Sequence, residues 1–298
     1  MTELSPSRLG KYTRCPRMYD YNYVQNVTVP DFTRRYIDRG QALHKTIEKV
    51  CERVKSIHTD EELRELAFEL FEESWEAQTD MEEYDTEAHY RYDRQLARAG
   101  IEDYFGDGPG LEHVRNSVAS EVNLSCERQG VSLHGRADNV VETDDGLKIV
   151  DYKPSLSGII TGKKDYLGEH SSGEEYHPGR VKSMFQAATY LEGVKNLSEY
   201  DDGMELEFTF YGLLQERDFE KSADGVRATA SGRGRDVAWI YEEHYDKVWE
   251  MITETYEGIL NESFEPEPWE LIRENVCEDC DYRRMCADYI SSEVRFDV

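Results

Sequence analysis

The stretch GRADNVVETDDGLKIVDYK, residues 135–153, decides the fold expected of this chain. It contains two segments of strand-like composition on either side of TDDG, which is a turn sequence, and it therefore predicts a β-hairpin. The apolar residues Leu147, Ile149 and Val150 lie close together in the second segment. They indicate that this strand is central in a sheet rather than exposed at its edge.

Two registers of this hairpin are compatible with the sequence. With a loop of residues 144–145, Asp138 lies directly across from Asp151, and with a loop of residues 145–146 it lies across from Lys153. In both registers the three charged side chains project from one face, because paired residues share a face and so do i, i+2 neighbours. Two carboxylates and an ammonium are therefore expected within one small space.

These three charged side chains together have a chemical use. Two carboxylates can hold a hard divalent cation such as Mg²⁺ or Mn²⁺. The cation polarises a phosphodiester and lowers the pKa of a bound water, and a neighbouring lysine can orient that water, help to deprotonate it or stabilise the pentavalent phosphate. The alternative is a surface hairpin with a cross-strand salt bridge, but a buried charged trio on a central strand needs a reason.

The remaining sequence predicts helices first and a sheet afterwards. Apolar positions recur at helical spacing before the hairpin and alternate around it. The expected helices cover residues 36–56, 60–78, 84–105, 182–197 and 242–262, and the expected strands cover 117–126, 131–142, 147–153 and 204–215. We interpret residues 155–180 as a long loop or lid and residues 223–236 as a polar, basic loop. This order predicts an α/β core with an N-terminal helical insertion.

The composition says little about the ligand. The chain has 298 residues and a net charge of −28, from 63 acidic and 35 basic residues. The charges are spread along the whole length rather than gathered in a tail, which favours the solvated surface of a halophilic protein over an acidic, disordered or partner-binding surface. No apolar run approaches the roughly 20 residues that span a bilayer, and the first residues lack the apolar centre of a secretory signal. We therefore expect a cytoplasmic protein without membrane association.

Three of the six cysteines stand close together near the end of the sequence. Cys277, Cys280 and Cys286 have a C-x2-C-x5-C spacing, which is typical of metal or cluster ligands. Such a site usually needs four thiolates. In a reducing cytoplasm, clustered cysteines favour metal binding over disulfides. For Cys51 and Cys126, on a predicted helix and at a strand end, we expect simple packing.

Several motifs in this order resemble one nuclease family. GRAD, followed by a hairpin and IVDYK, resembles the core of the PD-(D/E)XK nucleases, in particular their RecB-type branch. RGQALH at 39–44 is similar to that family's G-x-x-x-H helix, and QAATY at 186–190 is similar to its Q-x-x-x-Y motif. The resemblance implies a restriction-endonuclease-like core, in which helices flank a mixed central sheet, with an N-terminal helical insertion and a C-terminal Cys-rich clasp.

The resemblance implies a set of metal ligands. His44, Asp138 and Asp151 would bind Mg²⁺ or Mn²⁺, and the main-chain carbonyl of Tyr152 would be an extra ligand. Glu121, in ASEVNLS, is similar to an acidic residue often found on the strand before the hairpin, and it is the additional candidate acid.

The same resemblance implies the catalytic residues. Asp138 and Asp151 would act through the metal, and Lys153 would assist the attacking water. Gln186 and Tyr190 are one helical turn apart and share a face. They would help to position Lys153 or the substrate strand.

The resemblance also implies where the fourth cysteine lies. Nucleases of the AddB kind and the CRISPR-associated exonucleases of this branch hold a [4Fe–4S] cluster through one upstream and three downstream cysteines. The segment LSPSRLGKYTRCPRMYDYNYV is similar to their opening motif, and it places Cys15 with Cys277, Cys280 and Cys286. Zinc is the alternative, although four-Cys zinc sites more often consist of two close pairs.

Other residues are candidates for contact with DNA. Tyr19, Tyr21 and Tyr23 could stack on unpaired bases, although packed core tyrosines fit equally well. Basic residues in loops could contact phosphates, although a solvated loop fits equally well: Arg34, Arg35, Lys163, Lys164, Arg227, Arg233 and Arg235. GIITGKK at 158–164 is not a phosphate-binding loop, because three residues instead of four separate its glycines and Lys164 stands where Ser or Thr is required.

Together these features predict a metal-dependent DNA exonuclease that acts on single-stranded ends, in DNA repair and recombination or in CRISPR adaptation, with a helicase or CRISPR adaptation proteins as partners. The alternative is a DNA-end-binding or processing subunit of a larger complex, with weak or no nuclease activity of its own. A third interpretation is an interaction protein held together by a cluster or zinc, with a degenerate site. The expected parts are an N-terminal segment (1–35), a helical region (36–110), a nuclease core (111–262) and a cysteine segment (263–298).

Overall fold

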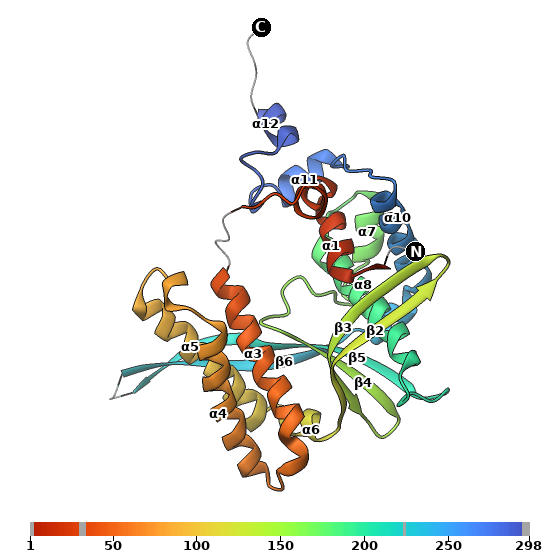
Figure 1. Cartoon of the computed structure of the whole chain (residues 1–298). Coiled ribbons are helices and arrows are strands. Elements are labelled where there is room, and N and C mark those ends of the chain that lie inside the picture. Colours follow the sequence, from red (N-terminus) through yellow and green to blue (C-terminus); the bar gives the residue numbers. More distant parts are fainter. Residues whose placement is uncertain (1–2, 30–33, 223–224, 294–298) are drawn as a thin grey trace.

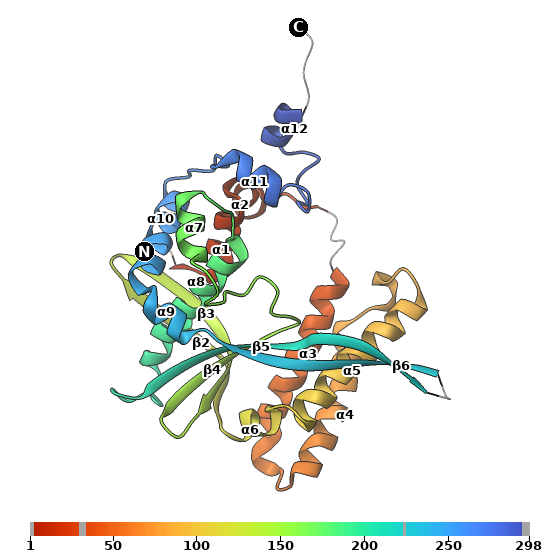
Figure 2. The same ribbon diagram turned by 180° about the vertical axis from the view of Figure 1, so that it is seen from behind.

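The computed structural model describes residues 3–29, 34–222 and 225–293. Its centre is a six-stranded mixed sheet with helices on both faces (Figures 1 and 2). The strands follow the order β1-β3-β4-β5-β6, and β2 pairs with β3 as well. Their bounds are β1 Glu3–Leu4, β2 Ser117–Arg128, β3 Val131–Glu142, β4 Gly146–Lys153, β5 Glu205–Ser222 and β6 Gly225–Asp236. The predicted α/β class, with a mixed sheet flanked by helices, is confirmed.

The central hairpin of β3 and β4 adopts the first of the two predicted registers. The Thr143 amide donates to the Gly146 carbonyl at 2.9 Å, which leaves residues 144–145 as the loop. Asn139 is then opposite Val150, and the ladder of paired residues ends there. The same register carried one step further places Asp138 opposite Asp151. β4 also pairs in parallel with β5 along its whole length, so it is the central strand that its apolar residues predicted.

One face of the sheet is covered by the helices that precede it in sequence. The predicted helices at 36–56, 60–78 and 84–105 are confirmed, and a box of reciprocal hydrogen bonds between Thr59 and Glu62 caps the second of them. Phe71, Trp75 and Tyr152 are fully buried in this layer. Its elements are α3 Arg34–Arg53, α4 Asp60–Gln78, α5 Glu87–Gly106 and α6 Gly110–Arg115, with 3₁₀ turns Val54–Ser56 and Met81–Glu83.

The opposite face packs against a second group of helices, which come from the start, the middle and the later part of the sequence (Figure 1). Its core includes Phe185 of α8 and Phe208 and Phe210 of β5. The helices are α1 Pro6–Arg14, α7 Tyr166–Ser172, α8 Pro178–Gly193, α9 Ala238–Glu243 and α10 Tyr245–Leu260, with a 3₁₀ turn Val194–Asn196. Helices α1 and α8 are in contact, so the N-terminal segment is part of the core.

A segment near the start of the chain packs against a segment near its end, beyond this second group of helices. Helix α2 (Pro16–Tyr19) and the π-helix Asp20–Val24 lie beside the segment that carries α11 (Trp269–Asn275) and α12 (Ala287–Glu293). Met18, Tyr21 and Ile272 form a small third core there. In the described residues, no helix combines the length and the apolar character needed to cross a membrane.

Two predictions about loops were wrong. Residues 223–236 were expected to form a loop, yet 225–236 are strand β6, which pairs antiparallel with β5. Residues 155–180 were expected to form a loop or lid, but Leu156, Ile159 and Ile160 are buried in the main core and α7 lies within the segment. The segment is therefore packed onto the domain.

A buried hydrogen-bond network joins the helical layer to the back of the hairpin. The Tyr104 hydroxyl lies 3.0 Å from Nδ1 of His113 and 2.8 Å from the Tyr152 hydroxyl. The Asn139 amide donates to the Tyr152 hydroxyl at 3.3 Å. His113 is only 6% exposed. Burial, followed by the Lys148 ammonium, lowers the pKa of His113 to about 4.

Acid is therefore expected to destabilise the protein through His113. In the unfolded chain this histidine binds a proton near pH 6.5, and in the folded protein only near pH 4, so the penalty grows as the pH falls from 6.5 to 4. At pH 5 it amounts to about 2 kcal/mol of the free energy of unfolding. Urea unfolding should show His113→Gln to be less stable than wild type at pH 7, with the gap narrowing by that amount at pH 5. Carboxylates titrate alike in both proteins, so an unchanged gap would contradict the prediction.

Candidate active site

The structure brings the predicted catalytic side chains together from four elements. Asp138 stands near the end of β3, and Asp151 and Lys153 stand on β4, where the hairpin ladder has ended. Helix α3 supplies His44 from one side of the sheet, and α8 supplies Gln186 from the other. Asp151 contacts Lys153 and Gln186, and Asp138 contacts His44. The group of ligand atoms that includes His44 and Asp138 has Glu121, not Asp151, as its third member.

Asp138 links the hairpin to helix α3. Its carboxylate accepts a hydrogen bond from the main-chain amide of Tyr152 at 2.7 Å. The same oxygen lies 3.4 Å from Nδ1 of His44. The Asp138 carboxylate is therefore bound to a main-chain amide of β4 just beyond the last pair of the ladder. This hydrogen bond fixes the carboxylate beside His44.

Asp151 is the most deeply buried charged group of the site, at 3% exposure. Its carboxylate forms an ion pair with the Lys153 ammonium. It also accepts a hydrogen bond from the side-chain amide of Gln186 at 3.2 Å. The Lys153 ammonium lies 5.5 Å above the centre of the Phe210 ring. The aromatic face and the Asp151 carboxylate thus both keep the ammonium in position.

Glu121 adds a third carboxylate and an unusual backbone. Its oxygen lies with ligand atoms of His44 and Asp138 in a group whose members are all within 4.8 Å of one another. It is also paired with Arg136 at 2.7 Å. Its φ angle is +51°, in the left-handed region that a non-glycine residue in a strand rarely adopts. Such backbone strain persists where the surroundings impose it, often at functional sites.

The electrostatics of the site are those of mutually compensating charges. Burial raises the pKa of Asp151, and the Lys153 ammonium opposes this only in part. Burial acts in the same direction on Asp138, but the neighbouring His44 outweighs it and lowers the pKa of that carboxyl. Conversely, burial would lower the pKa values of His44 and Lys153, but the two carboxylates raise both. Asp138 and His44, like Asp151 and Lys153, therefore stabilise one another's charged forms against the cost of burial.

Two of the predicted residues occupy supporting positions. The Tyr190 hydroxyl donates to the Arg136 carbonyl at 3.1 Å, and its ring lies against Gly135, where an added Cβ would come within 2.5 Å of it. Tyr190 therefore contacts the β3 backbone rather than Lys153. The Tyr152 side chain is buried on the opposite face of the sheet, in the network with Tyr104. Its ring also meets the His44 ring edge-on, with the two ring centres 6.1 Å apart, and its main-chain amide bonds to Asp138.

Glu121 allows a test that separates ligand from strain. Glu121→Gln and Glu121→Gly are both expected to weaken Mn²⁺ binding roughly tenfold, because each removes a carboxylate beside His44 and Asp138. Only glycine relieves the left-handed backbone, which is worth about 1 kcal/mol. Titration calorimetry and thermal unfolding should show equal affinity losses, with the glycine variant at least as stable as the glutamine variant. Wild-type affinity in both would remove Glu121 from the site.

The loop cations predicted to contact phosphates are largely occupied. Arg34, Arg35 and Arg227 pair with Asp38, Asp85 and Glu102. Arg235 donates to the carbonyls of Leu156 and Ile159 and so anchors the 155–180 segment. Lys164 lies 2.8 Å from Glu169 and 2.9 Å from Glu175. With His177 these carboxylates resemble a metal site, but the ammonium already compensates them.

Sequence reasoning missed three cations close to the site. Lys11 and Arg14 lie on α1, and Lys182 lies on α8, one helical turn before Gln186. All three line a groove that also includes Lys153 and Gln186. Gln186 in the recognised motif marks the helix, but no sequence signal connects it with α1.

The cysteines form a second candidate centre. Cys15 lies between α1 and α2, and it packs in the third core with Cys277 and Cys286. Cys280 is half-buried at the edge of that core. Burial, and then the nearby Cys280 and Cys286 thiols, raise the pKa of Cys15 to about 12. The four predicted residues are therefore neighbours in space although more than 260 positions separate Cys15 from the others. Cys126 packs in the main core, away from them.

Comparison with known proteins gives one family match and one similar solved structure. A family model described as the PD-(D/E)XK nuclease superfamily matches residues 3–287. A crystal structure from Eubacterium rectale, described as "Putative exonuclease", is similar to this chain at 15% sequence identity and a TM-score of 0.42, over 95% of this chain and 87% of that chain. No curated protein matches the sequence.

Proposed function

Because this chain belongs to the PD-(D/E)XK nuclease superfamily, we propose that it is a metal-dependent deoxyribonuclease that removes nucleotides from single-stranded DNA ends. One observation carries the proposal. Asp138, Asp151, Lys153 and His44 meet at one place, linked by the contacts of Asp138 with His44 and of Asp151 with Lys153. Within a nuclease superfamily this set is suited to phosphodiester hydrolysis.

The donor set fits a hard divalent cation. Asp138, Asp151 and His44 would hold Mg²⁺ or Mn²⁺, with the Tyr152 carbonyl and Glu121 as further ligands. Buried carboxylates whose charge is balanced only by His44 and Lys153 suit this role, because a dication can replace the histidine proton. When bound, the cation would polarise the phosphodiester and acidify a water molecule.

Side chains of the protein would orient the attacking water and stabilise the charge that develops on the phosphate. Lys153 lies beside Asp151 and above the Phe210 ring. We propose that its ammonium orients the attacking water and stabilises the negative charge that develops on the phosphate. Gln186 fixes the Asp151 carboxylate through its amide, so it acts as a positioning residue. Tyr190 supports the β3 backbone next to Asp138.

We also propose that the four cysteines hold a [4Fe–4S] cluster, as in the RecB-type branch. The one-plus-three arrangement of the cysteines in the sequence supports a cluster over a single zinc ion, because four-Cys zinc sites more often consist of two close pairs. We further propose that the chain has four parts, with boundaries after residues 35, 110 and 262. We also propose that it acts in DNA repair and recombination or in CRISPR adaptation.

The test is digestion of end-labelled DNA by the purified protein. Single- and double-stranded substrates should be compared with and without Mn²⁺, at high KCl to suit the acidic chain. We expect Mn²⁺-dependent release of label from single strands with free ends and resistance of circular single strands. Cleavage of circles would contradict exonuclease action, and binding without any cleavage would indicate the end-binding subunit instead.

A further inference from the structure

Among the described residues, those that line a groove beside the candidate active site include four cations and no carboxylate. Lys153 and Gln186, which also belong to the candidate site, are two of the lining residues. Its walls come from α1, from the segment that follows β4 and from the start of α8, and it encloses about 820 Å³. The other charged residues that line it are Lys11, Arg14 and Lys182. We call it the α1–α8 groove.

Three of the cations in the groove, Lys11, Arg14 and Lys182, have no ion-pair partner among the described residues. In the described part of the chain, no carboxylate forms an ion pair with Lys11, Arg14 or Lys182, although the sequence has 63 acidic residues. Elsewhere, cations such as Arg17 and Arg39 are paired with aspartates at 2.8 and 2.9 Å. Asp281 and Asp151 act on Lys11 and Lys182 only from beyond ion-pair distance, so no described carboxylate is paired directly with either ammonium group.

The unpaired cations are held near one another despite their repulsion. Burial, and then Lys153, lower the pKa of Lys182. Burial, and then Arg14, lower the pKa of Lys11. The two helices are also close, since a Cβ on Gly10 would lie 2.5 Å from Cγ of Lys182. Gathering like charges costs free energy that an anionic ligand would recover.

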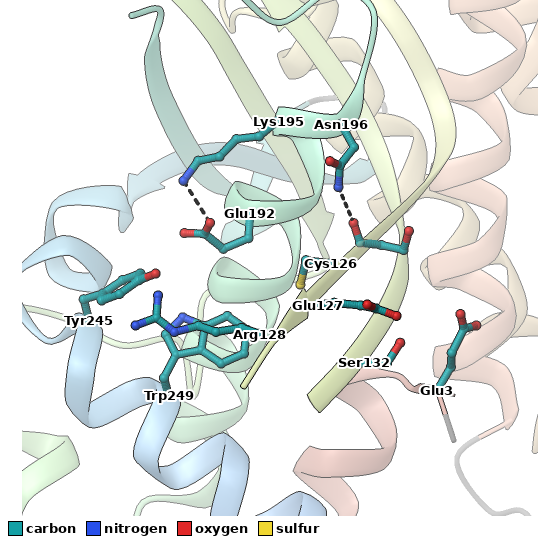
Figure 3. Close-up of a pocket in the computed structure, with 11 residues that line it drawn as sticks. Glu3, Cys126, Glu127, Arg128, Ser132, Glu192, Lys195, Asn196, Tyr245 and Trp249 are labelled. Atoms are coloured by element: carbon teal, nitrogen blue, oxygen red, sulfur yellow. Dashed lines mark hydrogen bonds and ion pairs between the residues drawn. The ribbon is translucent and has the colours of Figure 1, made fainter. Parts of the chain in front are cut away.

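Another hollow in the molecule shows the contrast. The pocket in Figure 3 lies away from the catalytic residues and encloses about 550 Å³. It mixes Glu3 and Glu127 with Arg128, and its Lys195 is paired with Glu192 at 2.9 Å. Because its charges are of both signs, this pocket does not suit a polyanion.

We propose that the α1–α8 groove binds the backbone phosphates of the nucleic-acid strand next to the scissile bond. The inference rests on the proposed nuclease function, since Lys153 and Gln186 belong to both the groove and the catalytic site. Lys11, Arg14 and Lys182 line the same groove as the catalytic lysine, and its volume of about 820 Å³ has room for more than one phosphate. Cations along such a groove suit a chain of phosphates, which carry affinity without reading base sequence.

The test measures binding without cleavage. Fluorescein-labelled oligothymidylate of twelve nucleotides is titrated by anisotropy in EDTA, with Asp151→Asn in every protein to prevent hydrolysis. The test protein adds Lys11→Gln, Arg14→Gln and Lys182→Gln, and the control adds Lys195→Gln, which removes a paired cation of the other pocket. KCl is varied over the range in which circular dichroism is the same for all proteins.

Each phosphate contact with a single strand contributes about 0.7 to the slope of log K against log salt. The triple substitution is therefore expected to reduce the slope by about 2 and to weaken binding at least tenfold at the lowest salt. The control should bind as the parent does. An unchanged slope in the triple variant would overturn the groove, even if the wild-type protein cleaves DNA.

A second measurement covers a triple variant that fails to fold. Oligonucleotides with one neutral methylphosphonate at successive positions are bound to the parent and to Lys182→Gln alone. The position that Lys182 contacts should weaken binding by the parent and have no effect on the variant. Equal losses in both proteins at every position would refute the contact. If the wild type cleaves no nucleic acid yet these differences appear, the nuclease proposal fails and the groove remains.

Discussion

Asp151→Asn is expected to lose at least about a thousandfold of the rate of DNA cleavage while the protein stays folded. The side chain is buried and bonded to Lys153 and Gln186, and its amide replacement keeps the shape but not the charge that a cation needs. Loss of metal-assisted charge stabilisation is worth several kcal/mol, and each 1.4 kcal/mol is tenfold in rate. Steady-state cleavage of labelled single-stranded DNA and circular dichroism measure the two effects.

Lys153→Ala is expected to be equally inactive by a different route. Without the ammonium, the pKa of Asp151, already raised by burial, rises further, so the carboxyl is neutral over more of the pH range. Raising the pH should then restore Mn²⁺ binding, because it ionises Asp151, but not cleavage, because the lysine is still missing. Calorimetry across pH checks the first effect. Full activity in either purified single variant would refute these assignments.

The second large effect is expected at the cysteines. Cys15→Ser should abolish iron binding and an absorption band near roughly 400 nm, if thiolates hold a cluster. Because the binding free energy of such a centre is delivered on folding, the segments around residues 5–29 and 265–290 should lose several kcal/mol of stability. Limited proteolysis should then cleave these segments first.

Cys126→Ser is the matched control for that variant. Cys126 is also a buried free cysteine with its pKa raised to about 12 by burial, but it packs in the main core. It should keep its iron and its protease resistance. Equimolar zinc in the purified wild type, with no iron or acid-labile sulfide, would contradict the cluster and leave the four-cysteine site itself in place.

The hairpin was predictable because its parity does not depend on its register. Either loop placed Asp138, Asp151 and Lys153 on one face, and the structure selected the one with residues 144–145 in the turn. The first three long helices were equally accessible, since each has one apolar face. These are local periodicities, and local chemistry fixes them.

Strand β6 could not be predicted from its own amino-acid sequence. Its sequence is polar and glycine-rich, because it is an edge strand that packs closely on neighbours, so that a Cβ on Gly232 would lie 2.6 Å from the Tyr211 ring. Its neighbours, rather than an apolar alternation, make it a strand. The α1–α8 groove was hidden for a similar reason. A sequence shows that Lys11 and Lys182 are basic, but not that they meet without a carboxylate.

The long β5–β6 ribbon bears on how the enzyme would work. It runs beyond the sheet and along α5 (Figure 1), where the Gly232 amide donates to Asp103 at 2.7 Å and Phe219 stacks on Tyr92. A Cβ on Gly100 would lie 2.4 Å from Leu214, so helix and ribbon touch without a gap. This brace opposes hinge motion between the helical layer that carries His44 and the sheet that carries Asp138. Catalysis would then begin from a preorganised site. Turnover would be limited by movement of the DNA strand through the site rather than by closure of the protein.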